Sequence, residues 1–319
     1  MQSKIFDRVS FWALFIVIVL LPVFCLPFSN IGIETSKGIL VVLGLAISLV
    51  CWAIARFTDG NIVLPKSWLA LSGVGVVLAT LLSALFSGNA KVSLFGDMFD
   101  VGSFWFIFAG VLFMLMCGLI FRNSKHAKVI LLGTILSSAL VLVFQSAHLF
   151  MPNILSLGLL PEKTSNILGS WNALALFAGF AGLMFLLVVE FFPIAKLEKI
   201  LLQVFILLSI LLAAVVNFPL VWILLGISSL IIFVYKVSIS FQQESTEGTE
   251  RKFPLISFAV VIISLIFFMS GQFVGGAISE RLQISNAEVG PSLAATLTVG
   301  KGVVAKDPVF GVGPNRFAE

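Results

Sequence analysis

The sequence predicts an all-α membrane protein, a polytopic bundle of about nine transmembrane helices, and three observations support this class. Hydrophobic residues make up 60% of the 319 residues, and charged residues only 11%. The mean hydropathy of +1.15 is far above that of a soluble globular domain. The chain also has 32 Phe but one Tyr, so most aromatic rings face lipid or a dry interior, where a phenol lacks a hydrogen-bond partner.

Nine apolar windows of the chain have the length that a membrane crossing requires, about 20 residues for a hydrocarbon core of about 30 Å. They are Ser10–Leu26, Gly38–Ala55, Ser67–Phe86, Gly102–Phe121, Val129–Phe150, Trp171–Phe191, Ile200–Val216, Pro219–Tyr235 and Phe253–Gln272. Only Asn217 and Phe218 separate the seventh window from the eighth. We expect two crossings there, because the stretch is too long for one and Pro219 suits the first turn of a new helix.

Positive charges in the loops predict the orientation of these windows. If the N-terminus is cytoplasmic, the inside segments hold twelve of the nineteen basic residues: Lys4, Arg8, Arg56, Lys66, Arg122, Lys125, Lys128, Lys196, Lys199, Lys236, Arg251 and Lys252. Cytoplasmic loops are enriched in Lys and Arg, so we expect this orientation. Residues 1–272 then form the transmembrane domain. Residues 273–319 are expected to begin a large extracytoplasmic loop, truncated at Glu319.

Several common kinds of site are not indicated. Cys25, Cys51 and Cys117 lie in apolar runs without CxxC spacing or a neighbouring His cluster, so we expect neither a metal site nor a disulfide framework. None of the nine windows has Asp, Glu, Lys or Arg well inside its apolar run. Ion-coupled transporters usually carry such groups near the midplane, and their absence makes a pump or antiporter a weaker hypothesis. We therefore look for chemistry at the outer surface.

The outer segment between the third and fourth windows contains two carboxylates. Asp97 and Asp100 stand three residues apart, so they can share one face of a short turn. Asp100 is a candidate for binding a cation or orienting a sugar hydroxyl. The alternative is that both are solvated loop acids that keep this side negative.

The outer segment before the sixth window predicts a capped helix start. Ser170 is the expected N-cap, and the free amides of an outward-facing helix start can receive a phosphate oxygen. Asn172 adds a neutral donor beside it. The alternative interpretation is a capped helix that Trp171 anchors at the interface.

A further helix is predicted between Pro291 and Pro308, because proline favours helix starts and stops. Leu293, Leu297 and Val304 recur along it at helical spacing. The spacing predicts an amphipathic helix that lies on the membrane surface or against the bundle.

Four short segments carry a family signal. They are Ser93-Leu-Phe-Gly96 followed by Gly102, Gly169-Ser-Trp-Asn172, Glu288-Val-Gly-Pro-Ser292, and Asp307-Pro-Val-Phe-Gly-Val-Gly-Pro-Asn-Arg-Phe317. In this order and spacing they resemble the N-terminal part of the O-antigen ligase and O-antigen polymerase family of integral membrane proteins. The resemblance covers essentially the whole chain, and the ending Pro-x-x-Gly-x-Gly-x-x-x-Phe is its most specific part.

The resemblance implies a glycosyltransferase that needs no metal or other cofactor. It would move a saccharide from a polyprenyl diphosphate carrier to a glycan or lipid acceptor, at the outer leaflet of a bacterial-type inner (plasma) membrane. The expected partners are therefore this donor, its acceptor and membrane lipids, with no nucleic acid. Either a ligase or a polymerase fits the pattern.

Such a transfer needs cations to stabilise the diphosphate leaving group and a base for the acceptor hydroxyl. Arg281 and Arg316 are the bidentate-capable candidates for the diphosphate, with Lys301 as a point charge. Glu288 is the candidate base or sugar ligand, although a carboxylate before a helix is also favoured by the helix dipole alone. Arg281 and Glu288 are thus the catalytic candidates, and Arg316, Lys301, Asn172 and Asp100 the substrate-binding ones. Each of these charges can equally be an ordinary solvated one.

Two other classes of protein stay open on the sequence. One is a lipid or saccharide transporter whose cavity is lined by neutral groups such as Asn172. The other is a non-catalytic membrane subunit of a surface-polysaccharide system.

Overall fold

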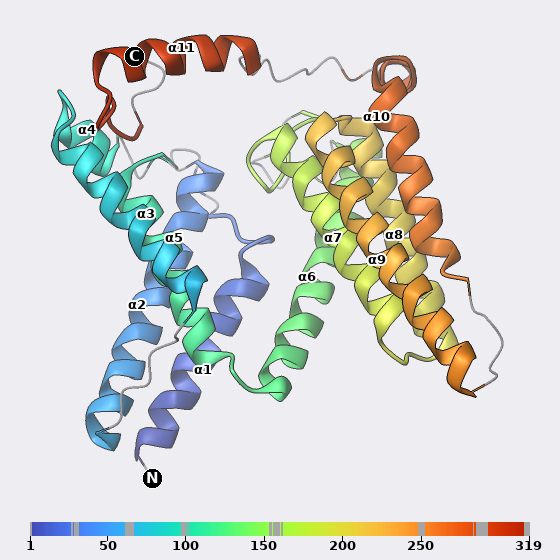
Figure 1. The fold of residues 1–319 in the computed structure, drawn as a ribbon, viewed down its shortest axis with the longest axis horizontal. Helices are drawn as coiled ribbons and strands as arrows, with labels where there is room; N and C mark the ends of the chain where they lie inside the picture. The colour runs from blue at the N-terminus through green and yellow to red at the C-terminus, as the bar shows by residue number, and fades with distance from the viewer. Residues whose placement is uncertain are drawn as a thin grey trace. The chain divides into compact units, whose positions relative to one another are not determined.

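The computed structural model describes most of the chain as helices and short connections (Figure 1). It describes residues 2–26, 28, 32–60, 67–96, 100, 102–152, 155, 160, 162–247, 253–282, 284 and 293–315. The helices are α1 (Gln2–Leu20), α2 (Ile33–Asp59), α3 (Trp68–Leu85), α4 (Ala90–Phe95), α5 (Phe104–Ile120), α6 (Ser124–Phe150), α7 (Trp171–Phe191), α8 (Lys196–Val216), α9 (Pro219–Glu247), α10 (Leu255–Leu282) and α11 (Leu293–Lys306). Every regular element in these residues is helical, which confirms the predicted all-α class.

Six of the described helices are long and apolar enough to cross a membrane. They are α2, α3, α6, α7, α8 and the Pro219–Ile239 part of α9. Helix α5 and the Leu255–Ser270 part of α10 are apolar but shorter. Only helices and closed barrels satisfy their backbone hydrogen bonds inside lipid, so these segments make the chain a multi-pass helical membrane protein.

The predicted windows each overlap one described helix, but the first is shifted. Helix α1 begins at Gln2, well before the window Ser10–Leu26. The early polar turn has a partner, because Asp7 accepts hydrogen bonds of 2.6 and 2.5 Å from Nη2 of Arg56 on α2. The short helix α4 lies in a segment that the sequence analysis treated as a loop.

The break between the seventh and eighth windows is confirmed. Helix α8 ends at Val216, and its C-cap residue Asn217 adopts the left-handed conformation with φ 53° and ψ 45°. Helix α9 begins two residues later at Pro219. The amide oxygen of Asn217 accepts a hydrogen bond of 3.2 Å from the indole of Trp222, which ties the turn to the helix that follows it.

Helix α10 extends beyond the predicted end at Gln272 and contains a kink. Ser270 leaves the helical region with φ −118° and ψ 19°, and the helix continues to Leu282. The Ser270 hydroxyl donates to the carbonyl of Ile266 at 2.6 Å. A serine that bonds back to the preceding turn commonly accompanies a helix bend.

The predicted C-terminal helix is present as α11, and its apolar side is exposed. Leu297 is 54% exposed and Val304 60% exposed. The sequence left two arrangements open for this helix, on the membrane surface or against the bundle. In the described residues, this apolar side is not packed against the bundle.

The chain divides into two compact units, which are described separately. Unit 1 comprises Met1–Thr134 and Val289–Glu319, and unit 2 comprises Ile135–Glu288. In unit 1, α1 and α2 are joined by the buried Ser10 and Ser48, whose hydroxyls lie 2.8 Å apart and each donate to the other's backbone carbonyl. Gly44 lies so close to Val17 that a Cβ atom there would overlap the valine side chain. Small residues of this kind let membrane helices approach closely.

In unit 2, α7 is the central helix, with 56% of its apolar window buried. Gly179 on α7 faces Val221 on α9, and Gly182 faces Ser209 on α8. A Cβ atom at these positions would lie 2.7 and 3.2 Å from its neighbour, respectively. The small residues of α7 therefore set its distance from two helices at once.

We predict that Gly44→Ala destabilises unit 1 whereas Gly38→Ala, on the same helix, does not. A methyl group at Gly44 meets Val17, but nothing lies within 4 Å of the Cβ position at Gly38. Overpacking of this kind costs about 1–3 kcal/mol, and both substitutions gain the same helix propensity. Thermal unfolding of the two variants in detergent measures the difference, and equal midpoints would contradict the close approach.

Candidate functional site

The candidate site lies in unit 1, where the connection between α3 and α5 meets the segment that follows α11. Helix α4 ends at Gly96, which has φ +63°. The backbone amide of Ser103, the residue before α5, donates to the carbonyl of Asp100 at 2.8 Å. This turn fixes the position of the Asp100 backbone at the start of α5.

The segment after α11, residues 307–315, folds into consecutive turns and is called the terminal segment below. The amide of Gly311 donates to the carbonyl of Asp307 at 3.1 Å. Gly311, Gly313 and Asn315 all have positive φ, at 65°, 99° and 61°. These left-handed residues reverse the chain direction, so that the terminal segment returns toward α3 and α4 (Figure 1).

Three side-chain contacts hold the terminal segment in unit 1. Nδ2 of Asn315 donates to Oδ2 of Asp100 at 3.0 Å. The Ser83 hydroxyl donates to the carbonyl of Phe310 at 2.6 Å, and the rings of Phe310 and Phe86 stack with centroids 4.3 Å apart. The bond to a charged carboxylate is the strongest kind of these contacts, because such hydrogen bonds contribute more than neutral ones.

Gly313 sits where no side chain fits. A Cβ atom there would lie 2.5 Å from Cβ of Ser87 and 2.6 Å from Oγ of Ser93. A Cβ atom at Gly102 would lie 3.0 Å from Oδ1 of Asn315. The two segments thus touch through glycines, and a larger residue at Gly313 would overlap two serine side chains.

Two serines near the ends of α4 and α5 carry buried hydroxyls. Ser93 and Ser103 are fully buried, and neither hydroxyl has a hydrogen-bond partner among the described residues. We call Ser87, Ser93, Asp100, Ser103 and Asn315 the Asp100 cluster. The Ser87 hydroxyl already donates to the carbonyl of Ala84 at 2.8 Å. Together with it, one carboxylate, one amide and the two unpartnered hydroxyls form a set of donors and acceptors that suits a hydroxylated ligand or ordered water.

The described residues contain no group of three or more His, Cys, Asp or Glu side chains able to hold a metal ion. Asp97, the second carboxylate of the predicted pair with Asp100, lies outside the described residues.

The other predicted site residues fall in different places. Arg281 is exposed in the last turn of α10, and Asn172 is half-buried in the first turn of α7, both in unit 2. Lys301 is exposed on α11, in unit 1 with Asp100. Because the two units are described separately, no distance joins Asp100 to Arg281 or Asn172. Glu288 and Arg316 lie outside the described residues.

The predicted N-cap of α7 is confirmed, since the Ser170 hydroxyl accepts from the amide of Ala173 at 3.0 Å. Asn166 supports the same turn from one side. Its Nδ2 donates to the Ser170 carbonyl at 3.1 Å, and its Oδ1 accepts from the Leu168 amide at 2.9 Å. The start of α7 is therefore held by side-chain hydrogen bonds on both sides of the cap.

No family model, curated protein or solved structure matches this chain. The assignment of a function thus depends on the residues and geometry described above.

One buried polar pair in unit 2 was not predicted from the sequence. Gln145 and His148 on α6 are both fully buried. Nε2 of Gln145 donates to the Ser165 carbonyl at 3.2 Å, and Nε2 of His148 lies 3.0 Å from the Glu162 carbonyl. Among the described residues, Oε1 of Gln145 and Nδ1 of His148 have no partner. The sequence does contain a signal for this pair: two polar residues stand three positions apart near the end of an apolar window, so they share one side of the helix.

We predict that Gly313→Ala detaches the terminal segment whereas Gly311→Ala largely leaves it in place. Both positions have positive φ, so alanine is strained at either one. Only Gly313 also meets other atoms, because nothing lies within 4 Å of the Cβ position at Gly311.

Amide hydrogen exchange of residues 307–315 measures this difference. The extra overlap at Gly313 corresponds to about 1–3 kcal/mol, so exchange should be roughly tenfold faster or more in Gly313→Ala than in Gly311→Ala. Equal exchange in the two variants would show that the close contact with Ser87 and Ser93 does not hold the segment.

Proposed function

We propose that this chain is a membrane glycan ligase or polymerase that transfers a saccharide from a polyprenyl diphosphate carrier to an acceptor at the outer face of the membrane. The observation that carries the proposal is the hydrogen bond between Asn315 and Asp100. It joins Asn315, in the last segment of the family resemblance, to Asp100, which is 215 residues away and lies between Gly96 and Gly102 of the first segment. Segments that share a family pattern and meet in space are expected at a common site.

The proposed reaction is a displacement at the anomeric carbon of the donor sugar. The acceptor hydroxyl forms the new glycosidic bond, the bond from the sugar to the diphosphate breaks, and the lipid diphosphate leaves. In this proposal Arg281 and Arg316 neutralise the charge that develops on the diphosphate, with Lys301 as a further cation. Glu288 takes the proton from the acceptor hydroxyl as it attacks.

In the same proposal the Asp100 cluster binds sugar hydroxyls rather than breaking bonds. Its carboxylate and amide already form one hydrogen bond with each other, and the buried hydroxyls of Ser93 and Ser103 lack partners among the described residues. Asn172 lies in the first turn of α7, whose start is well ordered by its cap. Neutral donors at such a helix start favour a phosphate oxygen.

The finer topology is also part of the proposal. We propose nine crossings with the N-terminus in the cytoplasm, so that residues 273–319 face outward. The distribution of Lys and Arg supports it, because the short outside loops hold only Lys37, Lys91 and Lys163.

We predict that Arg281→Ala and Arg316→Ala each reduce glycan transfer roughly a hundredfold or more, the loss typical of removing one group that stabilises developing charge. The assay follows saccharide transfer from a polyprenyl diphosphate donor by membranes that contain each variant. Lys306→Ala is the matched control, since it removes an exposed cation of α11 that has no proposed role.

Each variant must also insert into the membrane at the level of the unchanged chain. Arg281→Lys keeps the charge but not the bidentate geometry, so intermediate activity is expected. Full activity in both alanine variants would remove Arg281 and Arg316 from the proposed mechanism.

The proposed orientation predicts opposite labelling at two engineered cysteines. In a chain whose three native cysteines are replaced by Ala, Lys306→Cys should react with a membrane-impermeant maleimide on intact cells. Lys128→Cys, in the first turns of α6, should react only after the membrane is opened. Reaction of Lys128→Cys on intact cells, or protection of Lys306→Cys, would reverse the orientation.

A further inference from the structure

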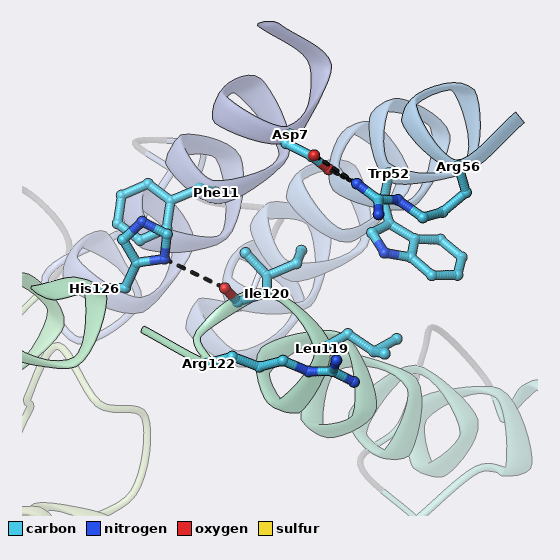
Figure 2. A pocket seen from close by; sticks show the side chains of 8 residues that line it. All are labelled: Asp7, Phe11, Trp52, Arg56, Leu119, Ile120, Arg122 and His126. Atoms are coloured by element: carbon cyan, nitrogen blue, oxygen red, sulfur yellow. Dashed lines mark hydrogen bonds and ion pairs between the residues drawn. The ribbon is translucent and has the colours of Figure 1, made fainter. Parts of the chain in front are cut away.

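Unit 1 also contains a cavity of about 300 Å³ that is separate from the Asp100 cluster. It is lined by Asp7, Phe11, Trp52, Arg56, Leu119, Ile120, Arg122 and His126, shown in Figure 2. These residues stand near the beginning of α1, the end of α2, the end of α5 and the beginning of α6. We call it the Arg56 cavity. Because four helices begin or end here, it lies at one end of the apolar bundle, where lipid head groups are found.

The charges at the cavity wall leave an excess of positive charge. Arg56 and Arg122 are two cations, and Asp7 is the one carboxylate among the described residues that line the cavity. A second carboxylate, Asp59, is outside the lining, and its Oδ2 lies 3.8 Å from Nη2 of Arg56. Both hydrogen bonds from Arg56 to Asp7 leave from the same nitrogen, Nη2 (Figure 2). Nε of Arg56 is buried and has no hydrogen-bond partner among the described residues. Both carboxylates, Asp7 and Asp59, thus pair with Nη2, which leaves other N–H groups of the guanidinium for a further anion.

The rest of the wall is apolar and aromatic. Phe11 packs on the ring of His126 with centroids 4.2 Å apart, and Nδ1 of His126 lies 3.3 Å from the carbonyl of Ile120. Trp52 adds a second large ring to the lining. A cavity with cations beside aromatic and aliphatic surface fits a ligand that carries an anion next to an apolar part. A small hydrated anion would leave that surface unused.

We propose that the Arg56 cavity binds the phosphate group of an anionic membrane phospholipid. Arg groups recognise phosphate through charge-assisted hydrogen bonds in a planar arrangement. The basic residues Arg8, Lys125 and Lys128 lie on the same helix ends and are exposed, so they raise the local concentration of anionic lipid. On the orientation proposed above this end faces the cytoplasmic leaflet, but the charge and lining of the cavity do not depend on that orientation.

The phosphate could come from a lipid or from solution, and a binding experiment separates the two sources. The full chain, purified in detergent, is titrated with phosphatidylglycerol and with phosphatidylcholine of the same acyl chains, and bound lipid is counted by native mass spectrometry. We expect phosphatidylglycerol to bind roughly tenfold more tightly, in line with hydrogen bonds to charged groups. A competition arm adds inorganic phosphate at millimolar concentration. Displacement of the lipid would assign the site to soluble phosphate, and no displacement would assign it to the lipid.

Two arginine variants test whether the cavity itself causes the preference for phosphatidylglycerol. Arg122→Gln should lose the preference for phosphatidylglycerol about tenfold. Arg8→Gln removes the same charge near the same end of unit 1 but does not line the cavity, so its preference should stay within about twofold of the unchanged chain. Equal losses in the two variants would show general attraction to a basic surface and would overturn the proposal.

In a third variant the expected change is an increase in lipid binding, which a loss of folding would not produce. Asp7→Asn removes the nearer of the two carboxylates that pair with Arg56, and therefore should increase phosphatidylglycerol binding several-fold. A misfolded variant does not gain a specific preference. Unchanged or weaker binding by Asp7→Asn would overturn the assignment of Arg56 to the phosphate. The measurement does not involve glycan transfer, so its result is independent of the proposed function.

Discussion

An unpaired polar group costs several kcal/mol inside the hydrocarbon of a bilayer, and this constraint determines where chemistry is located in the chain. The long apolar helices satisfy their own backbone groups. The polar side chains of both candidate sites lie near helix ends. The Asp100 cluster lies between α4 and α5 and beside the segment after α11. The Arg56 cavity lies at the ends of α1, α2, α5 and α6.

The same constraint explains how the helices hold together. Lipid tails are as apolar as Leu, so burial of apolar surface contributes little to contacts between membrane helices. Close packing and hydrogen bonds contribute instead. In unit 1 these are the contact of Gly44 with Val17 and the paired hydroxyls of Ser10 and Ser48. In unit 2 they are the contacts of Gly179 and Gly182 on α7.

Local features of the fold were predictable from the sequence. Apolar windows, the Ser170 cap and the break before Pro219 depend on neighbouring residues, so each appears in the helix pattern. Helix α4 was missed because six residues carry too little periodicity. The contact of Asp100 with Asn315 was missed because no local pattern encodes a partner 215 residues away. The Arg56 cavity was missed for the same reason, since its lining comes from four helices.

Gln145 and His148 show a further limit of prediction from the sequence. In the sequence they read as polar residues near the end of an apolar window, where a solvated position is ordinary. The structure buries both and pairs each with a carbonyl of the connection before α7. Whether such a residue is buried depends on how that connection folds back, which apolar periodicity does not describe.

Unit 1 is discontinuous in the sequence, and this affects the order in which the protein is made. Its first part ends at Thr134, and its last part begins at Val289, with all of unit 2 between them. A ribosome therefore completes unit 2 before it supplies the residues that contact Ser83, Ser87 and Asp100. Until then Gly102 and the buried serines lack this covering. The growing chain thus passes through a stage in which the Asp100 cluster is incomplete and lacks its hydrogen bond from Asn315.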